Sequence, residues 1–318
     1  SNWLEECPDV GEYDYAFAAI GDTQYLTGFY DNKLNQIYEY IRENAESQKI
    51  KFVFGLGDIT ERNSSEEWAQ AKTAIQSLNG VVPYSVVRGN HESTGMMKRY
   101  LPFSEYETVL GGSFNGDILN TWQELIVGEM KYLVFALDYG PTDAVLNWAS
   151  EIIEAHPYHN VIITTHGYLS HDGTLIDDNH SIAPTKTAGY NNGDDMWEKL
   201  VSKHSNIVMV LCGHDANDTL VVRESAGLNG NKVVQMMIDG TGIDAGTVDA
   251  AGMIAMFYFS EGGKKVQVRY YSTLRNQWFM AENQLQLELN VVGLEQEADL
   301  PIVVGAEDGK TYCGSVNV

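Results

Sequence analysis

The feature that most constrains the fold of this chain is an alternation of short apolar runs with segments of helical periodicity. Buried strands are predicted at 15–20, 51–58 and 83–91, and amphipathic helices at 32–47 and 65–78 lie between them. Because apolar and polar residues do not alternate along these runs, both faces of the strands are expected to be covered. The pattern predicts an α/β fold with helices outside a sheet.

The same alternation recurs in the middle of the chain, and a β-rich part follows it. Strands are predicted at 131–138, 160–167 and 206–214, with helices at 142–156 and 194–204. Four shorter runs of alternating residues are interpreted as antiparallel strands at 218–224, 232–239, 252–260 and 264–272. We therefore expect two packed mixed β-sheets flanked by helices.

The composition changes near residue 277. We predict a main domain over 1–276 and a small β extension or linker over 277–318, where alternating apolar residues mix with acidic ones. The Gly- and Asp-rich segment 239–252 lacks the ligand spacing of a calcium loop and is interpreted as a turn-rich connection.

Charge narrows the choice of partners. The chain has 20 Lys and Arg against 44 Asp and Glu, a net charge of −24. A surface this acidic repels nucleic acid, so a polynucleotide partner is not expected. No apolar stretch is long enough to span a membrane. An anionic substrate would need a local positive centre, which a bound metal can supply.

The cysteines give weaker information. Cys212 lies in an apolar run and is predicted to be a buried free thiol, whereas Cys7 and Cys313 could pair if the termini meet. Low cysteine content and strong acidity fit a bacterial secreted or cell-surface protein about as well as a cytosolic one, and we expect the former. The sequence does not indicate an oligomeric state.

Polar residues able to bind a metal follow five predicted strands. They are Asp22 in IGDTQ, Asp58 in GLGD, Asn90 and His91 in RGNHE, His166 in TTHG, and His214 in CGH. Each one alone is more often a turn residue, a helix cap or a histidine with an ordinary partner. Because sites of α/β sheets form at the carboxyl ends of strands, the five together predict one metal site.

The order GD…GD…GNHE…TH…GH resembles the calcineurin-like metallophosphoesterases, the family that includes purple acid phosphatases, over residues 13–275. The resemblance implies a four-layer αββα sandwich and two divalent metals bridged by Asp58. Asp22 would bind the first metal, and Asn90, His166 and His214 would bind the second. Residues His91 and Glu92 are the catalytic candidates: His91 would steady a phosphoryl oxygen or protonate the leaving group, with Glu92 as its orienter.

The first metal site departs from the family pattern at two positions. Gln24 stands where the family usually has a histidine, and Ala216 stands where the last motif usually has another. Gln24 is a weaker ligand. Asp215 or Asn217, which flank the gap, could replace the missing histidine, as could a water molecule or Asp218. An oxygen-rich first site would favour Mn²⁺, Mg²⁺ or Ca²⁺ over Zn²⁺. We expect one or two divalent ions per chain, with Mn, Fe, Zn, Mg and Ca as candidates.

Three residues near the motifs are candidates for binding substrate. Arg62 and Arg88 could hold a phosphate, or equally could form structural ion pairs, and His171 could line the substrate entrance or belong to a solvated loop.

The sequence therefore predicts a metal-dependent phosphoesterase. It would hydrolyse a phosphomonoester or phosphodiester of a small molecule by attack of a metal-bound hydroxide. The alternative is a catalytically weakened or non-catalytic surface binding module that keeps one metal site. Ala216 motivates the alternative, and His91 argues against it, because a pure binding module has little use for a general acid.

Overall fold

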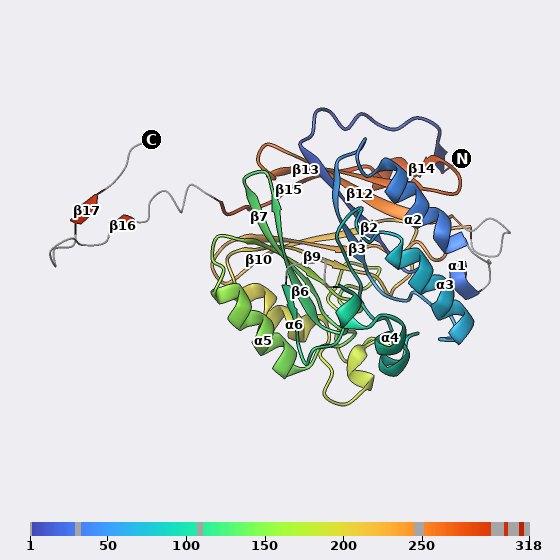
Figure 1. Ribbon diagram of the computed structural model, residues 1–318, viewed down its shortest axis with the longest axis horizontal. Coiled ribbons are helices and arrows are strands. Elements are labelled where there is room, and N and C mark those ends of the chain that lie inside the picture. The colour runs from blue at the N-terminus through green and yellow to red at the C-terminus, as the bar shows by residue number, and fades with distance from the viewer. Residues whose placement is uncertain are drawn as a thin grey trace.

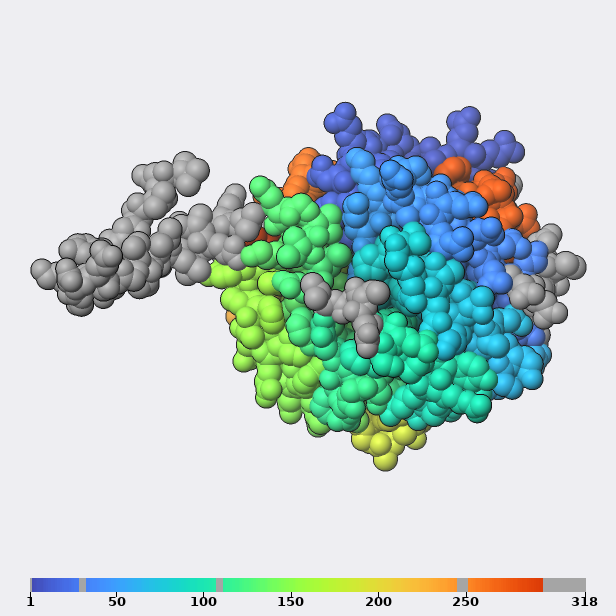
Figure 2. Space-filling model, in the orientation of Figure 1, coloured from blue at the N-terminus to red at the C-terminus, as the bar shows by residue number. Residues whose placement is uncertain are grey.

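Two mixed β-sheets packed face to face form the centre of the molecule, with helices on their outer faces (Figure 1). The computed structural model describes residues 2–28, 33–106, 111–244, 251–293, 302–304 and 312–314. The predicted fold class, two packed mixed sheets flanked by helices, is confirmed. In the space-filling view the blue-to-cyan surface of the N-terminal segment borders the green surface of the central segment (Figure 2).

The first sheet has the strand order β1-β14-β13-β12-β2-β3-β4, and β15 also pairs with β13. Its strands are β1 (Trp3–Leu4), β2 (Tyr15–Ile20), β3 (Ile50–Gly55), β4 (Tyr84–Ser85), β12 (Met253–Ser260), β13 (Lys265–Ser272), β14 (Gln277–Phe279) and β15 (Leu285–Glu288). Strands β2, β3 and β4 are parallel to one another. Because β14 and β15 both pair with β13, the segment predicted as a separate extension from residue 277 begins inside this sheet.

The second sheet has the order β10-β11-β9-β8-β7-β6-β5. Its strands are β5 (Gly111–Ser113), β6 (Thr121–Val127), β7 (Met130–Ala136), β8 (Asn160–Thr164), β9 (Ile207–Cys212), β10 (Val221–Ala226) and β11 (Lys232–Met237). The interpretation of 232–239 as a purely antiparallel strand was wrong. Strand β11 is antiparallel to β10 but parallel to β9, so its carboxyl end lies at the same edge as that of β9.

The described residues form helices close to the four predicted positions, and two further short helices, Gln24–Gly28 and Thr94–Tyr100, that were not predicted. In chain order the helices are α1 (Gln24–Gly28), α2 (Lys33–Asn44), α3 (Ser65–Gln76), α4 (Thr94–Tyr100), α5 (Asp143–Glu154) and α6 (Gly193–Lys199), with 3₁₀ turns at Phe103–Tyr106, Pro184–Lys186, Val201–Lys203 and Ala281–Asn283. Ser64 and Glu67 form a capping box that starts α3. Helices α2 and α3 cover the first sheet, and α5 and α6 cover the second (Figure 1).

Apolar residues form a core between the sheets and a further core under each helical layer. Along β2, Phe17 faces the second sheet and Ala18 faces α2 and α3, and both are fully buried. Along β9, Met209 and Val210 divide in the same way between the inner core and α5. This double coverage explains why the strands read as unbroken apolar runs.

Two segments differ from their prediction. The strand predicted at 83–91 ends at Ser85, because the chain then leaves the sheet to carry the Asn90 motif. Strand β6 was not predicted from the sequence. Strands β16 (Ile302–Val304) and β17 (Tyr312–Gly314) pair antiparallel with each other.

The cysteine predictions are tested in part. Cys212 is a buried free thiol, as predicted, and Cys7 is an exposed free thiol. The side chain of Cys313 lies outside the described part of the chain. No helix among the described residues combines the length and the apolar character needed to cross a bilayer.

Candidate metal centre

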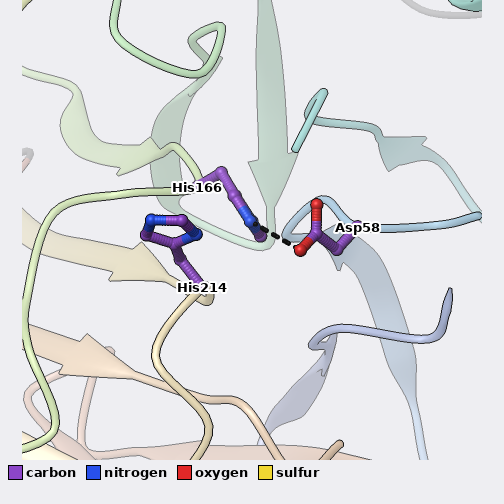
Figure 3. A group of neighbouring side chains, drawn as sticks. All are labelled: Asp58, His166 and His214. Carbon is purple, nitrogen blue, oxygen red and sulfur yellow. Dashed lines mark ion pairs between the residues drawn. The ribbon is translucent and has the colours of Figure 1, made fainter. Parts of the chain in front are cut away.

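Three polar side chains that follow different strands converge at one edge of the two sheets. Asp58 follows β3, His166 follows β8 and His214 follows β9, and their ligand atoms all lie within 4.8 Å of one another. Figure 3 shows the Asp58 carboxylate joined to the His166 imidazole by an ion pair, with His214 beside it. Carboxylate and imidazole together suit Mn, Fe or Zn, so this cluster has the donor set of a divalent-metal site.

The backbone is strained where it presents these ligands. Asp58 and His214 have left-handed φ angles of 46° and 85°, which cost non-glycine residues about 1–3 kcal/mol each. Gly57 has a φ of 96°, and a Cβ atom there would lie 2.6 Å from Nδ1 of His166. The two turns therefore adopt costly conformations that aim their side chains at a common point.

Hydrogen bonding fixes the orientation of His166, which is fully buried. Its Nδ1 lies 2.7 Å from the carbonyl oxygen of Leu56, which can only accept, so Nδ1 carries a proton. The other nitrogen, Nε2, lies 3.2 Å from Oδ2 of Asp58 and 3.1 Å from Oδ1 of Asn90. Three potential ligand atoms thus face one another, an arrangement that a cation stabilises.

His214 is held in the opposite tautomer. Its Nε2 donates to the carbonyl oxygen of Ile182 at 2.8 Å, and its Nδ1 is buried without a hydrogen-bond partner among the described residues. Burial, with the charge of His166, lowers the pKa of His214 to about 4, so the ring is neutral at pH 7 and Nδ1 keeps its lone pair. A buried nitrogen with a free lone pair, next to Asp58 and His166, fits a metal ligand.

The carboxylates of the site differ in their ionisation. Burial would raise the pKa of Asp58, but His166 and the backbone N–H of His91 hold it at about 2. Burial raises the pKa of Asp22 well above its ordinary value, and the nearby Asp239 and Asp58 add to the effect. Burial and the neighbouring carboxylates thus disfavour the ionised form of Asp22, and a divalent cation would favour it.

The predicted first-site residues lie next to this cluster. Asp22 Oδ2 is 3.9 Å from Nε2 of His166, and its carboxylate accepts the backbone N–H of His214. Gln24 is buried, and its Oε1 has no hydrogen-bond partner among the described residues. Asp22, Gln24 and Asp58 can therefore supply oxygen ligands, while Ala216 supplies none.

His91 sits at the mouth of the cluster with 30% of its side chain exposed. Its Nδ1 is 2.9 Å from the carbonyl oxygen of Glu61, and its Nε2 is 3.9 Å from Oδ2 of Asp58. Burial would lower the pKa of His91, but the Glu61 carbonyl and the Asp58 carboxylate raise it on balance. The Nε2 atom of His91 thus faces the site, which is the position that a general acid requires.

The structure corrects the interpretation of Glu92 as the orienter of His91. The carboxylate of Glu92 is fully buried and accepts the backbone N–H of Thr60 at 2.9 Å, the Thr60 hydroxyl at 3.1 Å and the backbone N–H of Gly89 at 2.8 Å. Burial, followed by the charge of Asp58, raises the pKa of Glu92 to about 7. Glu92 therefore joins the loops after β3 and β4, and the Glu61 carbonyl orients the His91 ring.

Comparison with known proteins agrees with this arrangement. The family model of the calcineurin-like phosphoesterases matches residues 15–245. The chain belongs to this family. The uncharacterized protein YvnB of Bacillus subtilis (strain 168) is 25% identical over 272 residues, which are 81% of this chain and 20% of YvnB. This member of the family therefore spans about a fifth of that relative's length.

Among solved structures, a plant phosphatase shares the fold. Purple acid phosphatase PPD1 from yellow lupin (Lupinus luteus) seeds superimposes with a TM-score of 0.51 at 14% identity, covering 84% of this chain and 52% of its own. GAP50, the anchor in the inner membrane complex of Plasmodium, gives a TM-score of 0.49 at 11% identity, covering 88% of this chain and 90% of its own. The lupin likeness supports the phosphoesterase sandwich described above.

In this member of the family, Arg88 forms the structural ion pair that the sequence left open. Its guanidinium is buried and contacts Asp138 through Nε at 2.6 Å and Nη2 at 3.2 Å. It also donates to the carbonyl oxygen of Glu92 and to the hydroxyl of Tyr190. With its donors directed at protein acceptors, Arg88 connects elements of the two sheets and does not present a fork to a phosphate.

The other substrate and ligand candidates lie outside the cluster. Arg62 is exposed, and its Nη1 donates to the carbonyl oxygen of Gly28 at 2.7 Å. Oδ2 of Asp215 accepts from the Ser170 hydroxyl and from both the backbone N–H and Nδ1 of the exposed His171. Asp215 thus holds the 170–171 loop and is not part of the metal-ligand cluster among the described residues.

One residue of the site was missed by sequence reasoning. Asp239 follows β11, is 3% exposed, and its side chain is in hydrogen-bonding contact with Asp22. Its motif, IDG, is similar to the IGD motif that carries Asp22: in both, an apolar strand is followed directly by an Asp and a Gly, in opposite order. The signal was present, but residues 239–252 were interpreted as a turn-rich connection, so Asp239 was not considered as a ligand.

Proposed function

We propose that this protein is a metal-dependent phosphoesterase that hydrolyses a phosphomonoester or phosphodiester of a small molecule. The observation that carries the proposal is the orientation of the two histidines. In both His166 and His214, one ring N–H donates a hydrogen bond to a backbone carbonyl oxygen, and the other ring nitrogen lies toward Asp58. Membership of the calcineurin-like phosphoesterases supports the same conclusion.

The residues divide the chemistry between them. When bound, divalent cations offset phosphoryl charge and activate water for in-line attack. Asp58, Asn90, His166 and His214 would hold one such ion, and Asp22 with Gln24 would contribute to a second beside it, giving a binuclear centre. His91, partly buried beside the cluster, would donate a proton to the leaving group or a hydrogen bond to a phosphoryl oxygen.

The charge of the molecule supports a small substrate. A net charge of −24 repels extended polyanions, whereas a compact phosphate ester can reach a local cationic centre.

The test is turnover of a simple monoester and a simple diester, p-nitrophenyl phosphate and bis(p-nitrophenyl) phosphate. Protein stripped with chelator is reloaded with Mn²⁺, Zn²⁺, Fe²⁺, Mg²⁺ or Ca²⁺ in turn. We expect hydrolysis with at least one ion, lost in His214→Ala and kept in His156→Ala, whose ring bonds the Ile152 carbonyl at the end of α5. Lack of hydrolysis of either ester with every ion would refute the proposal.

A second candidate, a binding module that keeps one metal site, is favoured by Ala216. It predicts that one ion per chain is bound, that neither ester is hydrolysed, and that the loaded protein retains a phosphorylated ligand in equilibrium dialysis. Replacing Ala216 by histidine separates the two: a large gain in turnover would identify an enzyme limited by its first site.

We also propose an extracellular or cell-surface location, supported by the acidity and the low cysteine content. Fractionation of the source cells with an antibody to this chain would test it, and recovery in the cytoplasmic fraction would contradict it.

A further inference from the structure

We propose that Asp239 is a ligand of the first metal and takes the place of the histidine that Ala216 lacks. The inference deepens the proposed function and depends on it for metal binding, but not for turnover. It follows from the position of Asp239 in the sheet, its contacts, and the oxygen atoms around it.

The topology places Asp239 in the ligand row. Strand β11 runs parallel to β9, with Met237 paired to Cys212, so Asp239 and His214 stand two residues beyond paired positions on neighbouring strands. The backbone N–H of residue Ile238 donates to the carbonyl of Cys212 at 2.8 Å, which continues this register to the edge. Asp239 therefore leaves the sheet at the same edge as a residue of the metal cluster.

The end of β2 approaches the same point from the other sheet. A Cβ atom on Gly21 would lie 2.3 Å from the carbonyl oxygen of Ile238, so only glycine allows the two backbones to come this close. Asp22 follows Gly21 and Asp239 follows Ile238, and the two carboxyl groups are in hydrogen-bonding contact. They are 9% and 3% exposed. Two buried carboxyl groups in contact repel each other when ionised, and a divalent cation between them removes that repulsion.

Asp239 also bonds to the loop that contains Ala216, the position where the family usually has a histidine ligand. Its backbone carbonyl accepts the N–H of Asn217 at 3.0 Å, one residue after Ala216. Its Oδ1 accepts the N–H of Thr241 at 3.0 Å as well as the Thr241 hydroxyl, which fixes the carboxylate orientation. An oriented carboxylate beside Ala216 is the property that a replacement ligand needs.

A second, independent observation points to a ligand at this place. Oε1 of Gln24 is buried and has no hydrogen-bond partner among the described residues, although Gln24 is only two residues from Asp22. Buried amide oxygens are normally satisfied, and an ion would satisfy this one. With Asp22, Asp58 and Asp239, Gln24 completes four oxygen ligands.

The donor set predicts the type of metal. An all-oxygen site with three carboxylates suits Mn²⁺, Mg²⁺ or Ca²⁺, whereas the second site, with two imidazoles, also accepts Zn²⁺. The two sites are therefore expected to differ in affinity for Zn²⁺, and Mn²⁺ is the ion that both can take.

The test measures Mn²⁺ binding to the full chain without substrate. Equilibrium dialysis with elemental analysis should give two Mn²⁺ per chain for the wild type and one for Asp239→Asn, with affinity at the lost site reduced at least about a hundredfold. Electron paramagnetic resonance should change from a spin-coupled pair to an isolated ion. Asp215→Asn is the matched control and should keep two.

A purely structural role for Asp239 would make the metal-free Asp239→Asn protein less stable than the wild type, whereas the proposed ligand role would not. Asparagine keeps an oxygen for Thr241 and removes the repulsion with Asp22, so the metal-free Asp239→Asn protein should be as stable as the wild type or more stable. If Asp239→Asn does not fold, Asp239→Asn combined with Ala216→His is measured instead and should bind two ions.

Three results would overturn the assignment: two Mn²⁺ bound with wild-type affinity in Asp239→Asn, loss of both ions together, or a double variant that binds one ion or fails to fold. Failure of the proposed function is a separate outcome. A wild type that binds two Mn²⁺ and loses one in Asp239→Asn, yet hydrolyses no ester, supports the ligand and refutes the hydrolase.

Discussion

Replacing Glu92 by glutamine should weaken both the fold and metal binding without removing any ligand. The carboxylate joins the loop of Asp58 to the loop of Asn90 through three hydrogen bonds, to Thr60 twice and to Gly89 once. The variant keeps the volume of the side chain and one carbonyl oxygen. It therefore isolates the contribution of a single hydrogen bond in a buried place.

The magnitude follows from that geometry. The glutamine oxygen can still accept both donors of Thr60, but its NH₂ group then faces the N–H of Gly89, and both are donors. One buried N–H left without an acceptor costs about 1–3 kcal/mol of unfolding free energy. Because the two ligand loops lose their fixed spacing, Mn²⁺ affinity should fall about 10–100-fold.

The assay is urea unfolding and Mn²⁺ titration at pH 8, above the pKa of about 7 that Glu92 has in the folded chain. Glu43→Gln, on the exposed face of α2, is the matched control and should change stability by less than about 0.5 kcal/mol. If Glu92→Gln kept wild-type stability and Mn²⁺ affinity but lost turnover, the loop-joining role would be wrong and Glu92 would act directly in catalysis.

Three further predictions concern the same region. Burial and two neighbouring carboxylates raise the pKa of Asp22 above its unfolded value, so the metal-free protein should lose stability as the pH rises from 5 to 8. Calorimetry should therefore show a larger metal-induced rise in Tm at pH 8 than at pH 5. An equal rise at the two pH values would contradict this. Asp138→Ala leaves the buried Arg88 unpaired and should cost about 3–5 kcal/mol in urea unfolding, whereas a loss under 1 kcal/mol would mean that Arg88 has other adequate partners. His91→Asn should lower kcat about 10²–10⁴-fold at unchanged Mn²⁺ content, and a change in metal content instead would make His91 a ligand.

The sequence by itself determined most of the framework and half of the site chemistry. The strand and helix alternation is a local pattern, written in the spacing of apolar residues, so β2, α3 and β9 could be predicted within a few residues. The metal motifs are local too, because each is a strand followed directly by a turn and a polar residue. The roles assigned to these residues individually are predictions that the tests above address.

Tertiary structure decided which polar residues share a partner. The pairing of Arg88 with Asp138 joins residues 50 positions apart, and no local pattern distinguishes it from a phosphate-binding arginine. The orientation of His91 by the Glu61 carbonyl, and not by the adjacent Glu92, depends on how two loops pack.

The place of Asp239 was decided in the same way. Its motif could be read in the sequence, but its edge of the sheet depends on β11 inserting parallel to β9. Strand direction is set by packing and by the path of the connecting chain, since a buried apolar strand has no direction in its composition. The sequence therefore specified the candidate ligands, and only the sheet topology determined which of them meet.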